Sequence, residues 1–294
     1  MLAAPSGKSN PQVRDLHRSD GGDQPRPMTD VSSPEFSLPG RFGIAAHVDD
    51  AGLRLVLTPQ AEVLAHGVVR ASVLAYAVDA VAGISIDESP DVWTLTTDLS
   101  LRMRPVPAPE ALEATSTVVR RGRRSVTSTF EVGDGNGAAV AWGAIGFATV
   151  PRRSADPPKP HVTPAVAAQM FTGRSTLSES LREAAGIEVL DAAAGVVQVT
   201  VTPELRNPAG TLQGAMVALV AEVAAEEMAA ARADAPVVVT DLDLRYLAQA
   251  PEGPLRTRAR RLGTAPDDPM QIELIDTSAD RLTTLVYARA RVLA

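Results

Sequence analysis

A weak internal repeat spans most of the 294-residue sequence. When the sequence is shifted by 143 residues against itself, ten of the 46 positions in 67–112 are identical. Five of these identities lie in one short segment, because TDLSLR (97–102) aligns with TDLDLR (240–245). A composition rich in alanine produces chance matches between alanines, but not a Thr-Asp-Leu-x-Leu-Arg match. An ancient duplication accounts for the pattern, so we expect two units of one fold.

Two segments without aliphatic periodicity separate the repeats from each other and from the start of the chain. Residues 1–35 are rich in Pro, Gly, Ser and Asp and are expected to form a disordered tail, because they bury too little apolar area to offset their ordering entropy. Residues 151–165 contain five prolines, which prevent regular hydrogen bonding and predict an extended linker. The predicted domains are therefore 36–150 and 166–294.

Each repeat has the same order of predicted elements. Two short strand-like runs come first, a long apolar helix follows, and four alternating β-rich runs close the unit. A helix that is apolar on nearly every side has to be surrounded by protein. We therefore predict the α+β class, with an antiparallel sheet wrapped around a central apolar helix in each domain. The runs are 42–48, 53–58, helix 67–86, 92–104, 111–121, 124–132 and 138–149, then 187–192, 195–202, helix 210–232, 237–247, 254–263, 269–276 and 282–293.

Composition excludes several classes of function. The net charge of −7 argues against nucleic-acid binding as the main activity, and the absence of cysteine excludes disulfides and thiolate chemistry. The four histidines are scattered, with no spacing typical of a zinc site. No apolar stretch reaches the ~20 residues that span a bilayer. We expect a cytoplasmic protein that needs no metal or redox cofactor and does not bind membranes.

A lone acid stands inside each apolar helix, at the same repeat position. Asp79 lies between Val78 and Ala80, and Glu222 lies between Ala221 and Val223. An unpaired carboxylate in such a place has a raised pKa or requires a partner. The two interpretations are a catalytic acid and a buried acid that is satisfied by an Arg, Ser or Thr from a neighbouring element.

The segment before the second helix, NPAGTLQGAM (207–216), combines a turn signal with a glycine at the helix start. Unpaired N–H groups at a helix N-terminus, together with the positive end of the helix dipole, can hold a developing oxyanion. Taken alone, Asn-Pro-x-Gly is a common loop. It becomes specific through the glycine seven residues after Asn207 and the acid eight residues after Gly214.

This pattern resembles the hotdog-fold acyl-CoA thioesterases of the phenylacetate-pathway (PaaI-like) type, in a tandem double-hotdog arrangement. Their signature is Asn-x-x-Gly-x-x-His-Gly-Gly with an acid nine residues after the His. Asn207, Gly210, Gly214 and Glu222 match it, whereas Gln213 stands at the His position. In the first repeat the acid is Asp79, Arg70 replaces the His, and the Asn is absent.

The resemblance implies that the amide of the first glycine polarises a thioester carbonyl, that the acid acts as general base or nucleophile, and that the Asn places substrate or water. Gly214 and Glu222 are separated by ~12 Å along one helix, which is too far for both to act on one carbon. The acid must then come from the other helix. We expect one hybrid site of Asn207, Gly214 and Asp79, and an impaired reciprocal site in which Glu222 faces the Ala71 amide with Arg70 at its mouth.

The remaining site candidates carry less information. Thr96, Thr97 and Thr240 begin the strand after each helix, where relatives place a hydroxyl that assists the acid; the alternative is that they are simply strand formers. His66 is a candidate for substrate contact, or a turn histidine without a role. The expected function is acyl-CoA hydrolysis in a homo-oligomer of such chains. The alternatives are a non-catalytic acyl-CoA-binding or regulatory protein and, because no His stands at the expected positions, less favourably a hotdog hydratase or dehydratase.

Overall fold

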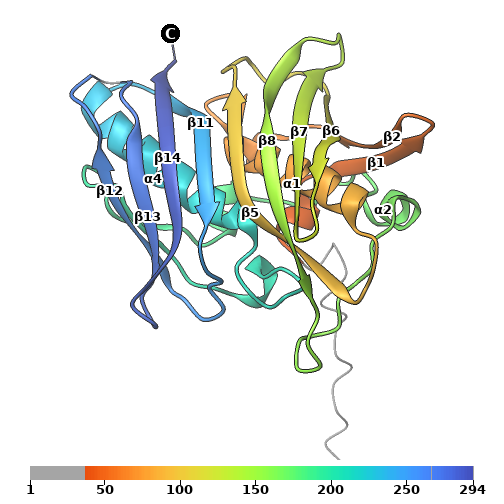
Figure 1. Ribbon diagram of the computed structural model, residues 1–294. Helices are drawn as coiled ribbons and strands as arrows, with labels where there is room; N and C mark the ends of the chain where they lie inside the picture. Colours follow the sequence, from red (N-terminus) through yellow and green to blue (C-terminus); the bar gives the residue numbers. More distant parts are fainter. Residues whose placement is uncertain (1–36, 266, 294) are drawn as a thin grey trace, which may run out of the picture.

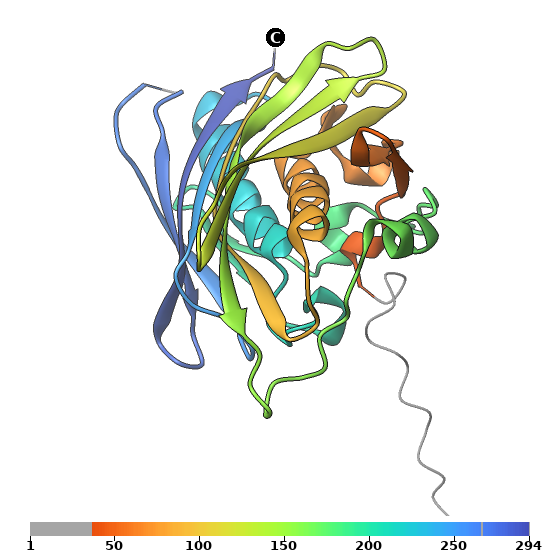
Figure 2. The same cartoon turned by 45° about the vertical axis from the view of Figure 1, so that its right-hand side comes forward.

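The computed structural model describes residues 37–265 and 267–293, so the tail expected at 1–35 lies outside the described residues. In the described part, one curved antiparallel sheet of 12 strands carries two long helices on its concave side (Figure 1, Figure 2). The strands are β1 Ile44–Asp49, β2 Gly52–Leu57, β5 Val92–Met103, β6 Leu112–Arg121, β7 Ser125–Asp134, β8 Ala139–Pro151, β9 Glu188–Asp191, β10 Val196–Val199, β11 Val237–Tyr246, β12 Leu255–Arg261, β13 Met270–Asp276 and β14 Arg281–Val292.

The sheet order reflects the sequence repeat. Read across the sheet, the strands follow β1-β2-β6-β7-β8-β5-β11-β14-β13-β12-β10-β9. Read inward from its own edge, the first half is β1-β2-β6-β7-β8-β5 and the second half is β9-β10-β12-β13-β14-β11. The two halves therefore place their strands in the same order. The two halves are thus related by a local two-fold axis that passes between β5 and β11.

The repeated TDLxLR segments form the seam between the halves. Leu101 pairs with Leu242 and Leu99 with Leu244 in antiparallel register. Arg102 Nε also forms an ion pair with Asp241 Oδ1 at 3.0 Å. Since these segments pair with each other across the axis, the strongest match in the sequence marks the place where the two repeats meet.

The long helices, α1 (Ala71–Ile86) and α4 (Gly214–Ala233), contact each other and the strands of their own halves. Both begin four residues later than the sequence predicts. Gly67 and Gly210 occupy the same repeat position, and each has φ of +81°, a left-handed conformation that a right-handed helix excludes. The glycines therefore form the turn before each helix. No helix in the described part of the chain has the length and hydropathy of a membrane span.

The short elements complete the two halves. In the first, β3 (Leu64–Ala65) and β4 (Val68–Val69) form a small separate hairpin before α1. The helix α3 (Leu181–Ala184) precedes β9, and three single-turn 3₁₀ helices cover Pro39–Arg41, Ala61–Val63 and Pro203–Leu205.

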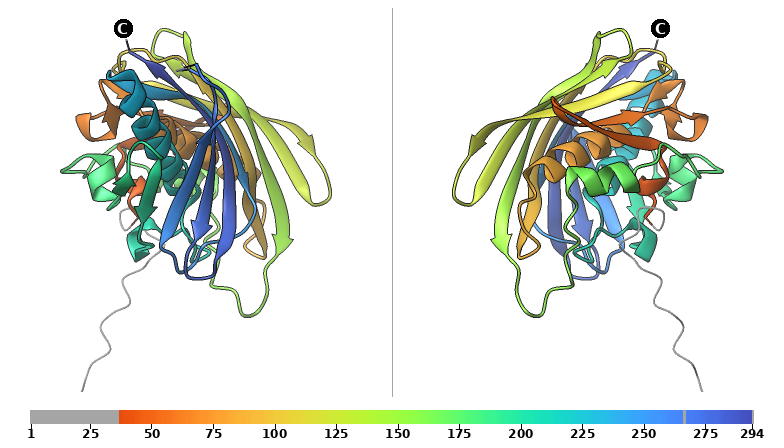
Figure 3. Two further views of the ribbon diagram at one scale, coloured as in Figure 1. Left: turned by 90° about the vertical axis from the view of Figure 1, so that its left-hand side faces the viewer. Right: turned by 90° about the vertical axis from the view of Figure 1, so that its right-hand side faces the viewer.

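The predicted linker 151–165 is tied to the first half. The Lys159 ammonium forms an ion pair with Asp87 and donates to Ser89 O at 2.8 Å. Helix α2 (Pro164–Met170) follows and lies beside β1 and α1 (Figure 3). Ala46 N–H then donates to Phe171 O at 3.0 Å. Residues up to about 176 thus pack on the first half, although the sequence assigns 166 onwards to the second.

Candidate active site

Asp79 lies near the middle of α1, half-buried and bonded to the neighbouring strand β5. The Thr96 hydroxyl donates a hydrogen bond of 2.6 Å to Asp79 Oδ1. Burial raises the pKa of Asp79 to about 6, and the hydrogen bond from Thr96 acts in the opposite direction. At pH 7 the carboxylate is therefore mostly ionised, yet it is far more basic than an ordinary aspartate.

Gly214 is the first residue of α4, and its N–H has no hydrogen-bond partner within the described part of the chain. The following two N–H groups, of Ala215 and Met216, are taken by the side-chain oxygen of Gln213 at 2.6 and 3.3 Å. Gln213, at the position of the family's His, is thus the N-cap of α4. It leaves one amide of the helix tip available for a ligand.

A cavity of about 310 Å³ brings the two helices' groups together, and we call it the Asp79 cavity. Asp79, Thr96, Asn207, Gln213 and Gly214 all line it. A neighbouring cavity of about 440 Å³ shares part of the wall, including Thr96, Asn207 and Gly214. The five residues come from both halves of the chain, and the two cavities adjoin at Gly214.

Asn207 holds the loop that precedes α4. Its side-chain oxygen accepts from the N–H groups of Ala209 at 3.0 Å and Thr211 at 3.2 Å. The Asn207 amide nitrogen makes no hydrogen bond within the described residues, so it is available to a ligand in either cavity. The role of this residue is therefore divided between shaping the loop and presenting a donor.

Two tyrosines that the sequence analysis did not single out border the site. The Tyr246 hydroxyl donates to Gly214 O at 3.0 Å, and a Cβ on Gly214 would lie 3.2 Å from that hydroxyl oxygen. Tyr76 lines the Asp79 cavity one helical turn before Asp79. Burial, and then the charge of Asp79, raises the pKa of both tyrosines. A sequence signal exists for Tyr246, since it directly follows TDLDLR where the first repeat has Met103.

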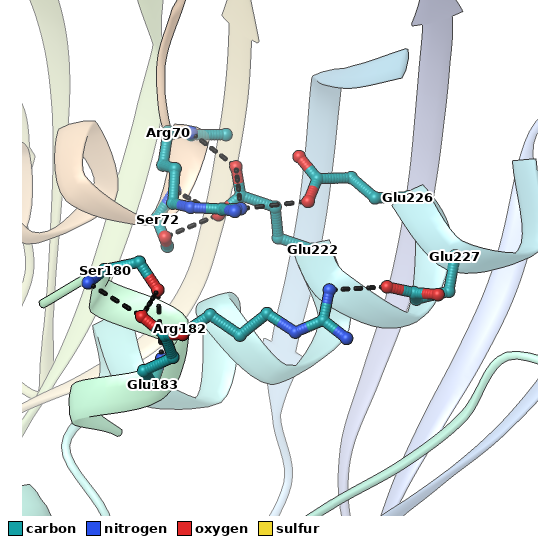
Figure 4. Close-up of polar contacts among 9 residues, drawn as sticks. Arg70, Ser72, Ser180, Arg182, Glu183, Glu222, Glu226 and Glu227 are labelled. Atoms are coloured by element: carbon teal, nitrogen blue, oxygen red, sulfur yellow. Dashed lines mark hydrogen bonds and ion pairs between the residues drawn. The ribbon is translucent and has the colours of Figure 1, made fainter. Parts of the chain in front are cut away.

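The reciprocal position has a different structure, shown in Figure 4. Glu222 on α4 is 1% exposed and accepts hydrogen bonds from the N-terminus of α1. The Ala71 N–H donates to Oε1 at 2.8 Å, and Ser72 donates to Oε2 from its N–H at 3.2 Å and from its hydroxyl at 2.5 Å. Glu222 therefore faces the Ala71 amide, and its own oxygens occupy the donors that a substrate would need.

Arg70 closes this second position. Its Nη1 lies 2.9 Å from Glu226 Oε2 and 4.0 Å from Glu222 Oε1, and the residue is only 9% exposed (Figure 4). Burial raises the pKa of Glu226 to about 7, while Arg70 acts against that rise. Arg70 was a candidate for substrate binding, but its charge is used within the protein by these two glutamates.

The other candidates do not line the Asp79 cavity. Thr97 and Thr240 sit in matching irregularities of β5 and β11, and their hydroxyls donate to the adjacent Asp98 and Asp241 at 2.9 and 2.8 Å. Thr97 lines the neighbouring cavity, whereas Thr240 lines neither. His66 is exposed in the β3–β4 turn, with φ of +51°, and also lines neither cavity.

Comparison of the sequence with models of protein families gives no match, and neither does comparison with curated proteins. Solved structures do match. The tesB protein of Mycobacterium avium subspecies paratuberculosis aligns with a TM-score of 0.56 at 11% identity, over 82% of this chain and 93% of that one. An acyl-ACP thioesterase from Bacteroides thetaiotaomicron aligns with a TM-score of 0.53 at 10% identity, over 85% and 98%.

A protein from Alicyclobacillus acidocaldarius described as having the hot dog fold aligns with a TM-score of 0.54 at 14% identity, over 87% of this chain and 98% of that one. The chain therefore has the hotdog fold, in the form seen in structures of hotdog thioesterases. This confirms the resemblance inferred from the sequence at the level of the fold.

Proposed function

We propose that the chain hydrolyses an acyl thioester at the Asp79 cavity. The observation that carries the proposal is that one cavity is lined by a carboxylate of raised pKa on α1 and by a helix-tip amide on α4 that has no partner among the described residues. These are the two groups that attack on a carbonyl needs: a base for the nucleophile and a donor for the oxyanion. The fold similarity to thioesterases supports the same class of reaction.

In the proposed reaction, Asp79 removes a proton from water as the water oxygen attacks the thioester carbon. The Gly214 N–H donates to the carbonyl oxygen as it becomes an oxyanion. The tetrahedral intermediate then breaks its C–S bond, and the protonated Asp79 returns the proton to the leaving thiolate. A pKa of about 6 suits both steps, because the group is ionised at neutral pH and still accepts a proton readily.

We propose acyl-CoA as the substrate, and two tandem hotdog domains of the PaaI-like type, assembled into a homo-oligomer, as the architecture. Two observations support the tandem arrangement: the strand order is the same in both halves, and each half packs one long helix against its own strands. The alternative is a protein that binds acyl-CoA without cleaving it. One observation favours that alternative: Gln213 takes two of the donors at the tip of α4.

The test is to mix the purified full chain with a series of acyl-CoAs of increasing length and a thiol reagent. Release of free CoA by the natural chain, lost in Asp79→Asn but retained in Glu222→Gln, is the expected result. Saturable binding without release of CoA supports the non-catalytic alternative. Equal losses in both variants contradict the single hybrid site.

A further inference from the structure

Arg206 is a charged residue of the Asp79 cavity to which the proposed reaction gives no role. It directly precedes Asn207, at the end of the 3₁₀ helix Pro203–Leu205, and its own N–H donates to Pro203 O at 3.2 Å. The residue is half-buried and its side chain lines the cavity. Its Nε is fully shielded from solvent and has no hydrogen-bond partner. Within the described residues, the guanidinium has neither an acceptor nor an ion-pair partner.

The acids of the same cavity do not neutralise Arg206. Asp87 is occupied by the Lys159 ammonium, and His161 Nδ1 lies 3.6 Å from its other oxygen. Asp79 is bonded by Thr96, and no cation contributes to its pKa. Among the described residues, no acid of this wall therefore pairs with the Arg206 guanidinium.

A partly desolvated guanidinium without an acceptor is unfavourable, and that cost is recovered when an anion binds. Its planar arrangement of donors matches the two oxygens of a carboxylate or a phosphate. Other arginines of comparable burial are already used in this way by the protein: Arg102, for example, bonds to Asp243 Oδ2 at 2.7 Å. Arg206 lines a cavity that can admit a ligand, and within the described residues its guanidinium donors are unused.

We propose that Arg206 binds an anionic group of the substrate. This inference rests on the proposed function, because it assumes that the ligand of the Asp79 cavity is a thioester. The anion has two sources within one such molecule, a carboxylate at the far end of the acyl group or a phosphate of the carrier. Both place the same chemistry, a pair of anionic oxygens, against the guanidinium.

The experiment measures equilibrium binding of non-hydrolysable thioether analogues by calorimetry, so that it does not depend on catalysis. Four ligands are compared, the thioether analogues of a pentanoyl and a glutaryl thioester, each built on either CoA or N-acetylcysteamine. The pentanoyl and glutaryl chains have equal length and differ in the terminal carboxylate, whereas N-acetylcysteamine lacks the phosphates of CoA. The variant is Arg206→Met, with Arg206→Gln as a second replacement in case the first folds poorly.

Arg289→Met is the matched control, because Arg289 is also half-buried with an unpartnered Nε but lines neither cavity at the site. We expect Arg206→Met to weaken binding about tenfold while Arg289→Met leaves it unchanged. A loss confined to the glutaryl ligands identifies the acyl carboxylate. A loss for both CoA ligands, regardless of acyl group, identifies the carrier phosphate.

The inference is overturned if Arg206→Met changes the affinity of every ligand by less than twofold, or if Arg289→Met produces the same loss. Tight binding of the analogues that depends on Arg206, combined with no cleavage of the true thioesters, refutes the proposed hydrolysis but retains the anion site. If none of the four ligands binds the natural chain, both proposals fail.

Discussion

The N-termini of α1 and α4 occupy equivalent places in the two halves, but one is closed and the other is open. At α1, the amides of Ala71 and Ser72 are occupied by Glu222. At α4, the amide of Gly214 borders a cavity, and the acid across from it is Asp79. The same scaffold thus holds a structural cap at the N-terminus of α1 and a candidate active site at the N-terminus of α4.

The length of the acid contributes to this difference. Glu222 has one more methylene than Asp79, and it reaches across to bond the opposite helix directly. Asp79 makes no such bond, so space remains between its carboxylate and the Gly214 amide for a ligand. Two neighbouring repeat positions also leave the α4 end open. Gly83, which lines the Asp79 cavity, stands where the second half has Glu226. Gln213 stands where the first half has the buried Arg70.

The largest effect is expected when the carboxylate of Asp79 is removed. Asp79→Asn should lower kcat/KM by about 10³-fold, because the proposed general base is lost. The same variant should be more stable at pH 7 by about 2 kcal/mol, because the raised pKa reports an unfavourable burial of the carboxylate. Below pH 4 this gain should vanish, since both side chains are then neutral. Rates of CoA release and chemical denaturation at both pH values measure the two effects. A loss of stability at pH 7 contradicts this account.

Lengthening the acid tests whether one methylene separates an open end from a closed one. Asp79→Glu should reduce kcat/KM by about 10²-fold, because the longer carboxylate can bond the Gly214 amide and occupy the oxyanion position. Stability should change little. Asp79→Glu keeps the carboxylate that Asp79→Asn removes, so the same assay on both variants separates the effect of length from that of charge. Activity close to that of the natural chain contradicts the idea that acid length keeps the site open.

The closed end should respond in stability rather than in catalysis. Glu222→Gln should lower the free energy of unfolding by about 3 kcal/mol, because a buried charge that accepts three hydrogen bonds and faces Arg70 is lost. The kcat/KM of the folded variant should change less than threefold. Denaturant unfolding at pH 7 and the CoA-release assay check both parts. A loss of activity as large as that of Asp79→Asn indicates two working sites.

The smallest effect concerns Thr96, the hydrogen-bond partner of Asp79. Activity of the natural chain should fall tenfold per pH unit below about pH 6, as Asp79 becomes protonated. In Thr96→Val this inflection should move upward by roughly one unit, because the hydroxyl bond that favours the ionised form is removed. Valine is the residue that the second half has at this position, Val239. A pH profile of kcat/KM measures the shift; an unmoved inflection assigns it to another group.

Much of the fold follows from the sequence, because the periodicities are strong. The predicted runs agree with the strands to within a few residues, and the TDLxLR match marks the seam. The helix starts were placed too early, because apolar residues after Gly67 and Gly210 extend the helical pattern through a turn that the glycines form. The packing of residues 166–176 on the first half depends on contacts with β1, which no local pattern encodes.

Part of the arrangement around the candidate site could be predicted. The helix rise indicates that an acid acting with Gly214 has to come from the opposite helix, which stays a prediction, whereas Glu222 does face Ala71. The roles of Gln213 and Tyr246 were not accessible, because each depends on where a side chain turns after the backbone is fixed. Arg70 illustrates the same limit, since its partner Glu226 is 156 residues away and is reached only through packing of the two helices.

The seam between β5 and β11 has a consequence for how this chain is held together. Its ladder of backbone bonds, together with the contact of α1 with α4, unites the halves independently of the exposed peptide around 153–155. A chain nicked there is expected to stay assembled, as two pieces that complement each other. In a dimer of identical subunits, every substitution occurs at both helix N-termini. In a single chain with two halves, the N-terminus of α1 and that of α4 can differ in sequence.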